Sequence, residues 1–168
     1  AMPAPSLHEI EIDQIPSDHP IAVFTQYFEK HKNRHGLLVA EEVDVLTFPT
    51  VLPWVLILDE LGSKNSEDHT FIYRFVGTGC ATLFGVDYTG FLFGDSLPPE
   101  ATEARYREFL RVQETRKPIY TYTSVPLEGR EFKEIYRCCF PATKSGSDLV
   151  DRFYCVIAET DRRIRHRP

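Results

Sequence analysis

Five short stretches of the chain carry the apolar patterns of β-strands, either alternating with a period of two or apolar throughout. They cover residues 54–60, 70–76, 119–125, 134–140 and 153–158. In the second stretch the alternation places Phe71, Tyr73 and Phe75 on one face. The last stretch is apolar on both faces, which predicts a strand that is covered from both sides.

Three further stretches have the periodicity or the end signals of helices. The first, residues 20–32, begins at a proline and carries Ile21, Phe24 and Phe28 on one stripe. Such an amphipathic helix has to dock on another surface. We expect either this helix or a partner subunit to cover one face of the sheet. The other two helices are expected at residues 78–84 and 100–116.

The order of these elements predicts an α+β fold. Two strands come first, helices are inserted between the second and third strands, and three strands follow, which predicts an antiparallel sheet of about five strands. An N-terminal amphipathic helix is added to this unit. We therefore divide the chain into an N-terminal arm and helix (1–36), a main domain (37–160) and a basic C-terminal tail (161–168). Residues 1–17 are proline-rich and are interpreted as an extended arm.

Composition narrows the class of protein. The chain has 168 residues, of which 42 % are apolar and 26 % charged, and its formal net charge is −6. This acidity argues against broad nucleic-acid binding, which needs a basic face. No apolar run approaches the roughly 18 residues of a membrane helix, so no membrane association is expected. Met2, the one methionine, is interpreted as the native start. Four cysteines within apolar segments indicate reduced thiols and a cytoplasmic location.

Three short segments resemble a known family. Residues 71–79, Phe-Ile-Tyr-Arg-Phe-Val-Gly-Thr-Gly, resemble the "YRlvGt" signature of a bacterial PAS subfamily that is frequent in alphaproteobacteria. Residues 83–90 resemble the "G-x-dlTG" step that follows it, and residues 135–142 resemble the family's late "LPL" strand. The resemblance implies a five-stranded antiparallel sheet whose helices enclose a small cavity. It also implies a role as a sensor, a dimerisation module or a regulator in signalling.

In a PAS-like fold several side chains would converge on the interior. The candidate ligand-binding residues are Tyr73, Phe75, Cys80, Phe84, Phe91, Tyr106, Phe109, Tyr122 and Arg137. The aromatic members either line a ligand pocket with a few polar tips or simply pack as core. Arg74 and Arg137 lie mid-strand among apolar neighbours. Each either meets an acid across the sheet or clamps a carboxylate or phosphate.

Cofactor and metal sites are not expected. Residues 100–116 contain no histidine, where haem-binding PAS domains carry their ligand, and residues 90–95 contain no cysteine for a flavin adduct. His31 and His35 have helical i, i+4 spacing but straddle a helix end and lack a third ligand nearby. No catalytic residues are assigned, because no nucleophile and base can be paired by spacing.

The sequence therefore predicts a non-catalytic, homodimeric PAS sensory domain in bacterial signal transduction. It would bind a small molecule, a signalling partner protein, or both, and act as a stand-alone regulator. Two alternatives remain at this point. One is a small α+β enzyme with a conical pocket, similar to nuclear-transport-factor-like isomerases, and the other is a purely structural dimerisation module.

Overall fold

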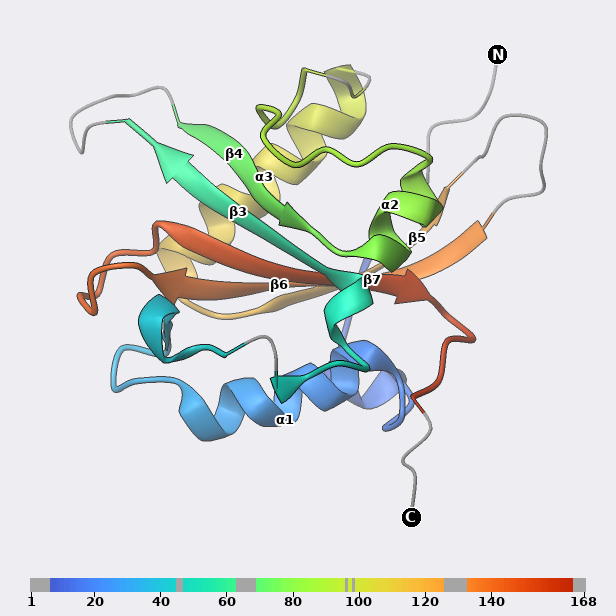
Figure 1. Ribbon diagram of the computed structural model, residues 1–168, viewed down its shortest axis with the longest axis horizontal. Helices are drawn as coiled ribbons and strands as arrows, with labels where there is room; N and C mark the ends of the chain where they lie inside the picture. Colours follow the sequence, from blue (N-terminus) through green and yellow to red (C-terminus); the bar gives the residue numbers. More distant parts are fainter. Residues whose placement is uncertain are drawn as a thin grey trace.

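A seven-stranded sheet forms the centre of the structure (Figure 1). The computed structural model describes residues 7–44, 47–62, 69–95, 97, 99–125 and 133–164. The strands are β1 (Leu7–Ile10), β2 (Leu38–Val39), β3 (Val55–Leu61), β4 (Thr70–Val76), β5 (Ile119–Val125), β6 (Lys133–Thr143) and β7 (Arg152–Glu159). Their order is β1-β5-β6-β7-β3-β4 with antiparallel neighbours, and the short β2 runs parallel to the end of β6.

The predicted α+β class is confirmed, but the predicted number of strands is wrong. All five predicted strands are present, and the described residues add two more, β1 and β2. β1 lies in the segment interpreted as an extended arm, where it pairs with the edge strand β5 from Leu7↔Thr123 to Ile10↔Tyr120. Four residues bounded by a proline-rich stretch give too short an alternation to reveal a strand. The unpaired edge of β5, which the sequence does not show, provides its partner.

Helix α1 (Pro20–His31) covers one face of the sheet (Figure 1). Phe24 and Phe28 are buried and pack on Phe140 of β6, with ring centroids 4.8 and 5.2 Å apart. Tyr154 of β7 belongs to the same apolar cluster. The helix therefore covers this face within one chain. The start of the predicted tail is also attached, because Ile164 is buried in this cluster.

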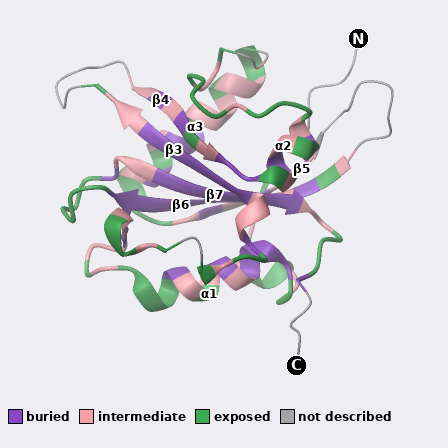
Figure 2. Ribbon diagram, viewed as in Figure 1, coloured by how far each residue is buried: buried purple, intermediate pink, exposed green. Residues whose placement is uncertain are grey.

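Helices α2 (Thr78–Phe84) and α3 (Pro99–Thr115) cover the opposite face. The rings of Phe71, Phe109 and Phe153 form the centre of this layer, with centroids 5.0–5.6 Å apart. Figure 2 shows the result, since β7 is buried between the two layers along most of its length while the outer faces of the helices are exposed. No helix in the described part of the chain is both long and apolar enough to span a membrane.

His19 fixes the start of α1 to the end of β7. Its ring is fully buried, Nδ1 accepts a hydrogen bond from the backbone N–H of Ile21, and Nε2 donates to the carbonyl of Glu159 at 3.0 Å. The neutral ring uses both nitrogens in this arrangement. Burial, together with the nearby charge of Arg163, lowers the pKa of His19 to about 4. Protonation would therefore remove the helix cap and leave a buried charge.

We predict that the folded state loses stability in acid through His19. Because the folded pKa lies below the unfolded value, the stabilisation is complete above about pH 6.5 and is lost as the pH falls toward 4. The expected loss in the free energy of unfolding between pH 8 and pH 5 is about 2 kcal/mol. Urea titrations should show a weaker pH dependence in His19→Asn, which retains a capping side chain, than in wild type. His8→Asn, at an exposed histidine, serves as the control, and an equal change in both variants would contradict this assignment.

Candidate functional site

Six of the nine candidate ligand-binding residues lie in the layer between the sheet and helices α2 and α3. They are Tyr73, Cys80, Phe84, Tyr106, Phe109 and Arg137. Phe109 is buried against the sheet, and the guanidinium of Arg137 lies 5.7 Å from the centre of its ring. The sequence thus brings most of these residues into one interior layer, although from four different elements.

Phe75 lies on the opposite face, in the cluster beneath α1. The pairing of β3 with β4 passes from Ile57↔Phe75 to Leu58↔Tyr73, so Arg74 is an extra residue in β4. This β-bulge places Tyr73 and Phe75 on different faces, although they are two residues apart. The prediction that both face the same interior is therefore wrong, because it assumed an unbroken alternation.

Phe91 and Tyr122 also lie outside the interior layer. Phe91 is 47 % exposed in the connection between α2 and α3. Tyr122 shares its face of β5 with Tyr120, which packs on the α1 side, and its hydroxyl donates to Glu134 at 2.7 Å. The residues of β5 on the face that α3 covers include the buried Ile119, Thr121 and Thr123. The pattern of β5 alone does not indicate which of its faces α3 covers.

The two mid-strand arginines have different environments. Arg74 is half exposed and its Nε donates to Asp59 across the sheet at 3.2 Å. Arg152 binds the same carboxylate through Nε and Nη2 at 2.6 and 2.9 Å. Arg74 thus meets an acid across the sheet, one of the two roles considered for it. Arg137 instead lies in the interior, with 4 % of its surface exposed.

Arg137 belongs to a buried charged cluster with Glu108 and Arg105 of α3. One carboxylate oxygen of Glu108 accepts a hydrogen bond from Nη1 of Arg137. The other accepts one from Nη1 of Arg105 at 3.4 Å, the one hydrogen bond of the Arg105 side chain among the described residues. Two guanidinium groups therefore share one carboxylate, and among the described residues the cluster has an excess of one positive charge. Burying an uncompensated ion costs several kcal/mol.

The ionisation of this cluster reflects that imbalance. Burial, with a contribution from the charge of Arg137, lowers the pKa of Arg105 to about 10. Burial is the largest influence on Arg137 and opposes its charge, but the carboxylate of Glu108 and the nearby Cys155, Cys139 and Tyr73 together outweigh it, so the pKa is raised. Tyr73 lies near both arginines, and burial raises its pKa, so its hydroxyl stays protonated. The best-compensated group is thus Arg137, and Arg105 has donors to spare.

Two threonines of β5 lie on the same face of the sheet. Thr121 pairs with Arg137 in the register of β5 and β6, and its hydroxyl donates to the carbonyl of Arg137 at 3.4 Å. Thr123, two residues further along β5, pairs with Ile135. Its hydroxyl is buried and has no hydrogen-bond partner among the described residues. A buried hydroxyl without a partner is costly, so its position favours a polar group that the described residues do not supply.

Arg105, Glu108 and Thr123 are not among the residues predicted from the sequence. The spacing of Arg105 and Glu108 places them one helical turn apart, so an ion pair between them could have been anticipated. The burial of Glu108 beside the apolar Phe109 could not have been anticipated, because a charged residue in an amphipathic helix is ordinarily assigned to the exposed face. The feature of the sequence that could have indicated a buried acid is Arg137, because an arginine in a strand requires an acid opposite it.

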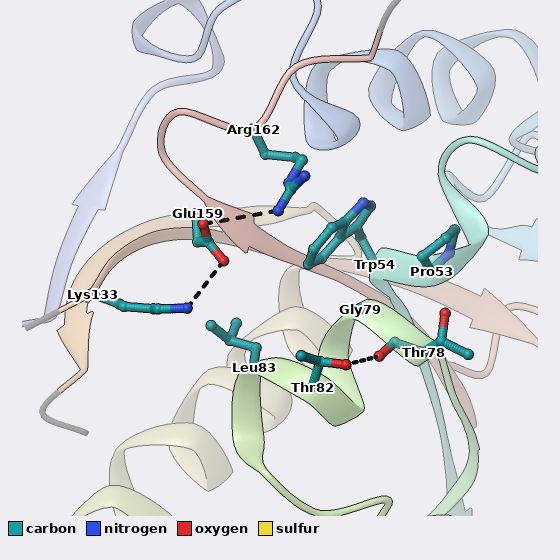
Figure 3. A pocket seen from close by; sticks show the side chains of 9 residues that line it. All are labelled: Pro53, Trp54, Thr78, Gly79, Thr82, Leu83, Lys133, Glu159 and Arg162. Carbon is teal, nitrogen blue, oxygen red and sulfur yellow. Dashed lines mark hydrogen bonds and ion pairs between the residues drawn. The ribbon is translucent and has the colours of Figure 1, made fainter. Parts of the chain in front are cut away.

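A second candidate is a groove of about 260 Å³ on the outer side of α2 (Figure 3). Its walls come from α2, from the start of β6, from the end of β7 and from the segment just before β3. The lining residues are Pro53, Trp54, Thr78, Gly79, Thr82, Leu83, Lys133, Glu159 and Arg162. Glu159 forms ion pairs with Lys133 at 3.5 Å and with Arg162 at 3.9 Å. The Arg162 guanidinium lies 4.6 Å from the centre of the Trp54 ring.

Two glycines allow α2 to approach this wall. A Cβ atom at Gly77 would lie 2.4 Å from the carbonyl oxygens of Leu52 and Pro53, and one at Gly79 would lie 2.7 Å from the ring of Trp54. Both contacts are too close for any side chain. The Gly-Thr-Gly sequence thus serves the close packing of a helix start, as the absence of a phosphate-loop lysine from the sequence indicates.

Helix α2 separates the groove from the charged cluster. Leu83 lines the groove and also belongs to the interior apolar layer, and Cys80 on the same helix is buried in that layer. Burial raises the pKa of the Cys80 thiol to about 12, so the thiol stays protonated. A change in the position of α2 would therefore alter both the groove and the interior layer.

When the chain was compared with protein families, curated proteins and solved structures, it matched no family model, no curated sequence and no solved structure. Within the described ranges, no group of three or more His, Cys, Asp or Glu side chains is arranged to hold a metal ion. The geometry of the two sites and the motifs of the sequence are therefore the basis for a function.

We predict that Glu108→Gln strongly destabilises the fold. The substitution leaves two buried guanidinium groups without a charged partner, and the expected loss in the free energy of unfolding is about 3–5 kcal/mol. The matched control is Glu103→Gln on the same helix, where the exposed Glu103 pairs with Arg107 and contributes less than about 1 kcal/mol. Equal unfolding free energies for the two variants, measured by urea titration, would contradict the role of Glu108.

Proposed function

We propose that this chain is a PAS-type sensory module that binds a small organic anion between the sheet and helices α2 and α3. The observation that carries the proposal is the buried cluster of Arg105, Glu108 and Arg137, which has one more guanidinium than carboxylate. A bound carboxylate would compensate this charge and would accept hydrogen bonds from Arg105. The neutral hydroxyls of Thr123 and Tyr73 are further donors on the same face.

The architecture supports this proposal. Two strands, a helical insert and three strands follow in the order that the resemblance to PAS domains implies. The segment similar to the family signature contributes Tyr73 to the interior layer and Gly77 and Gly79 to the packing of α2. The helical insert also lies over the sheet face that bears the charged cluster, where such families enclose their cavity.

Access from solvent is provided at Arg105. Its side chain is 18 % exposed, whereas those of Glu108 and Arg137 are each 5 % exposed. An anion that enters beside Arg105 would meet the least-compensated cation first. Rings of the interior layer, such as Phe93 and Phe109, with centroids 5.1 Å apart, would contact the apolar part of the ligand.

Binding without catalysis is supported by the state of the nucleophilic groups. Burial raises the pKa of Cys80 to about 12 and raises those of Cys138 and Cys139 well above the usual value, so these thiols are not activated. His19 has both ring nitrogens engaged in structural hydrogen bonds. Free, buried thiols also fit the proposed location in a bacterial cytoplasm.

A homodimer is also part of the proposal, but not one that pairs the sheet face beneath α1. The sheet face that a second subunit was expected to cover is covered by α1 of the same chain. Light scattering of the chain at about 100 μM is expected to give the mass of a dimer, and a monomer at this concentration would exclude a dimer of micromolar affinity.

We predict that the natively purified chain retains a small anion that native mass spectrometry detects and that denaturation releases. Arg105→Gln should reduce its occupancy, with an affinity about tenfold lower, because a charge-assisted hydrogen bond is lost. Arg107→Gln, on the exposed side of the same helix, should leave the affinity unchanged.

The same variants can be tested with a panel of small carboxylic acids by thermal denaturation. A stabilising acid present at 100 times its dissociation constant adds about 2.7 kcal/mol to the stability. No retained molecule and no stabilising acid, or equal effects of the two arginine variants, would contradict the proposed binding function.

A further inference from the structure

The two cations of the groove are only partly neutralised. Lys133 and Arg162 both approach the carboxylate of Glu159, at 3.5 and 3.9 Å, which is longer than a good charge-assisted hydrogen bond. Their side chains are about one-third and two-fifths exposed, so both can still turn toward a second acceptor. The groove thus has two positive charges for one negative charge, on a chain whose formal net charge is −6.

Trp54 orients one of these cations. The guanidinium of Arg162 lies over the indole ring, and a stacked guanidinium keeps its N–H donors at its edge, where a carboxylate can bind them. In Figure 3, Arg162, Glu159 and Lys133 line one side of the groove, and Leu83 and Thr82 of α2 lie opposite them. The groove therefore combines an apolar wall with a cationic wall.

The size of the groove indicates what it accepts. Pockets for small molecules usually measure about 300–1,000 Å³, whereas this groove measures about 260 Å³ and is open to solvent. It has room for one side chain of a larger partner. Tryptophan and arginine, which both line this groove, are residues enriched at the energetic centres of protein–protein interfaces.

We propose that this groove is the docking site for an acidic segment of a partner protein, with one carboxylate side chain bound between Lys133 and Arg162. This proposal rests on the proposed regulatory function in one respect, because a regulator needs a partner protein. Because the chain as a whole is acidic, general electrostatic attraction does not bring an acidic segment to it, and the local charge of the groove has to do so.

The position of the groove connects it to the ligand site. Leu83 belongs to both the groove and the interior layer, and Gly79 packs on the Trp54 ring. A ligand bound beside Arg105 that favours one position of α2 would shift the groove between two shapes. It could do so only by its difference in affinity for the two positions.

Trp54 is the one tryptophan of the chain, so its fluorescence reports directly on this groove. The probe is a fluorescein-labelled peptide, Gly-Glu-Glu-Leu-Glu-Glu-Gly, and its counterpart with glutamine for every glutamate. Only the acidic peptide should bind, measured as a rise in anisotropy, and its unlabelled form should change the Trp54 emission with the same midpoint. Arg162→Gln and Lys133→Gln should each weaken binding about tenfold.

The control is Arg163→Gln. Arg163 is exposed to a similar degree as Arg162, but it pairs with Asp18 outside the groove. This variant should change the affinity less than twofold. An equal loss in Arg162→Gln and Arg163→Gln would overturn the docking site. So would displacement of the peptide by acetate or glutarate at equal molar concentration, since the groove would then bind free acids.

The proposed docking site and the proposed ligand site can be contradicted independently by experiment. Arg162→Gln should retain the small anion detected by native mass spectrometry as wild type does. A chain that retains the anion but does not bind the acidic peptide would overturn the docking site and leave the proposed sensory function standing. A chain that binds the peptide but retains and responds to no anion would support the docking site and contradict the sensory function.

Discussion

The structure depends on the burial of β7 from both sides. Every residue from Phe153 to Ala158 is buried, so the strand needs an apolar layer on each face. Helix α1 supplies one layer and helices α2 and α3 supply the other. This requirement explains why the N-terminal segment is attached to the sheet, with His19 joining the start of α1 to the end of β7. The other strands extend this central strand on both sides.

The charged cluster is evidence for a binding function because it lies in a closed interior layer. Charges on the surface are screened and contribute little to stability, whereas buried guanidinium groups require partners. Glu108 compensates Arg137 well and Arg105 poorly, and Thr123 lacks a partner in the described part of the chain. These features lie between the sheet and the helical insert. The charge that Glu108 leaves uncompensated at Arg105 is the physical basis of the proposed sensory role.

Local patterns were sufficient for five of the seven strands and for the helices, but not for β1, β2 or the site. The ranges of β4, β5 and α2 follow from periodicity and from glycine and proline signals, because these act within a few residues. The face on which Phe75 lies depends on the bulge at Arg74, which arises from pairing with β3. The inward position of Glu108 likewise depends on Arg137, 29 residues away in sequence. Contacts between distant segments decide such placements, and one sequence does not reveal them.

The central claim is that the cluster of Arg105, Glu108 and Arg137 is completed by a bound anion. A crystal structure of the chain, purified without denaturation, tests this most directly. We predict electron density for a small anion within hydrogen-bonding distance of the Arg105 guanidinium, on the side toward Thr123. A cluster in which Arg105 is bound by Glu108 alone, with apolar side chains filling the space beside it, would contradict the account.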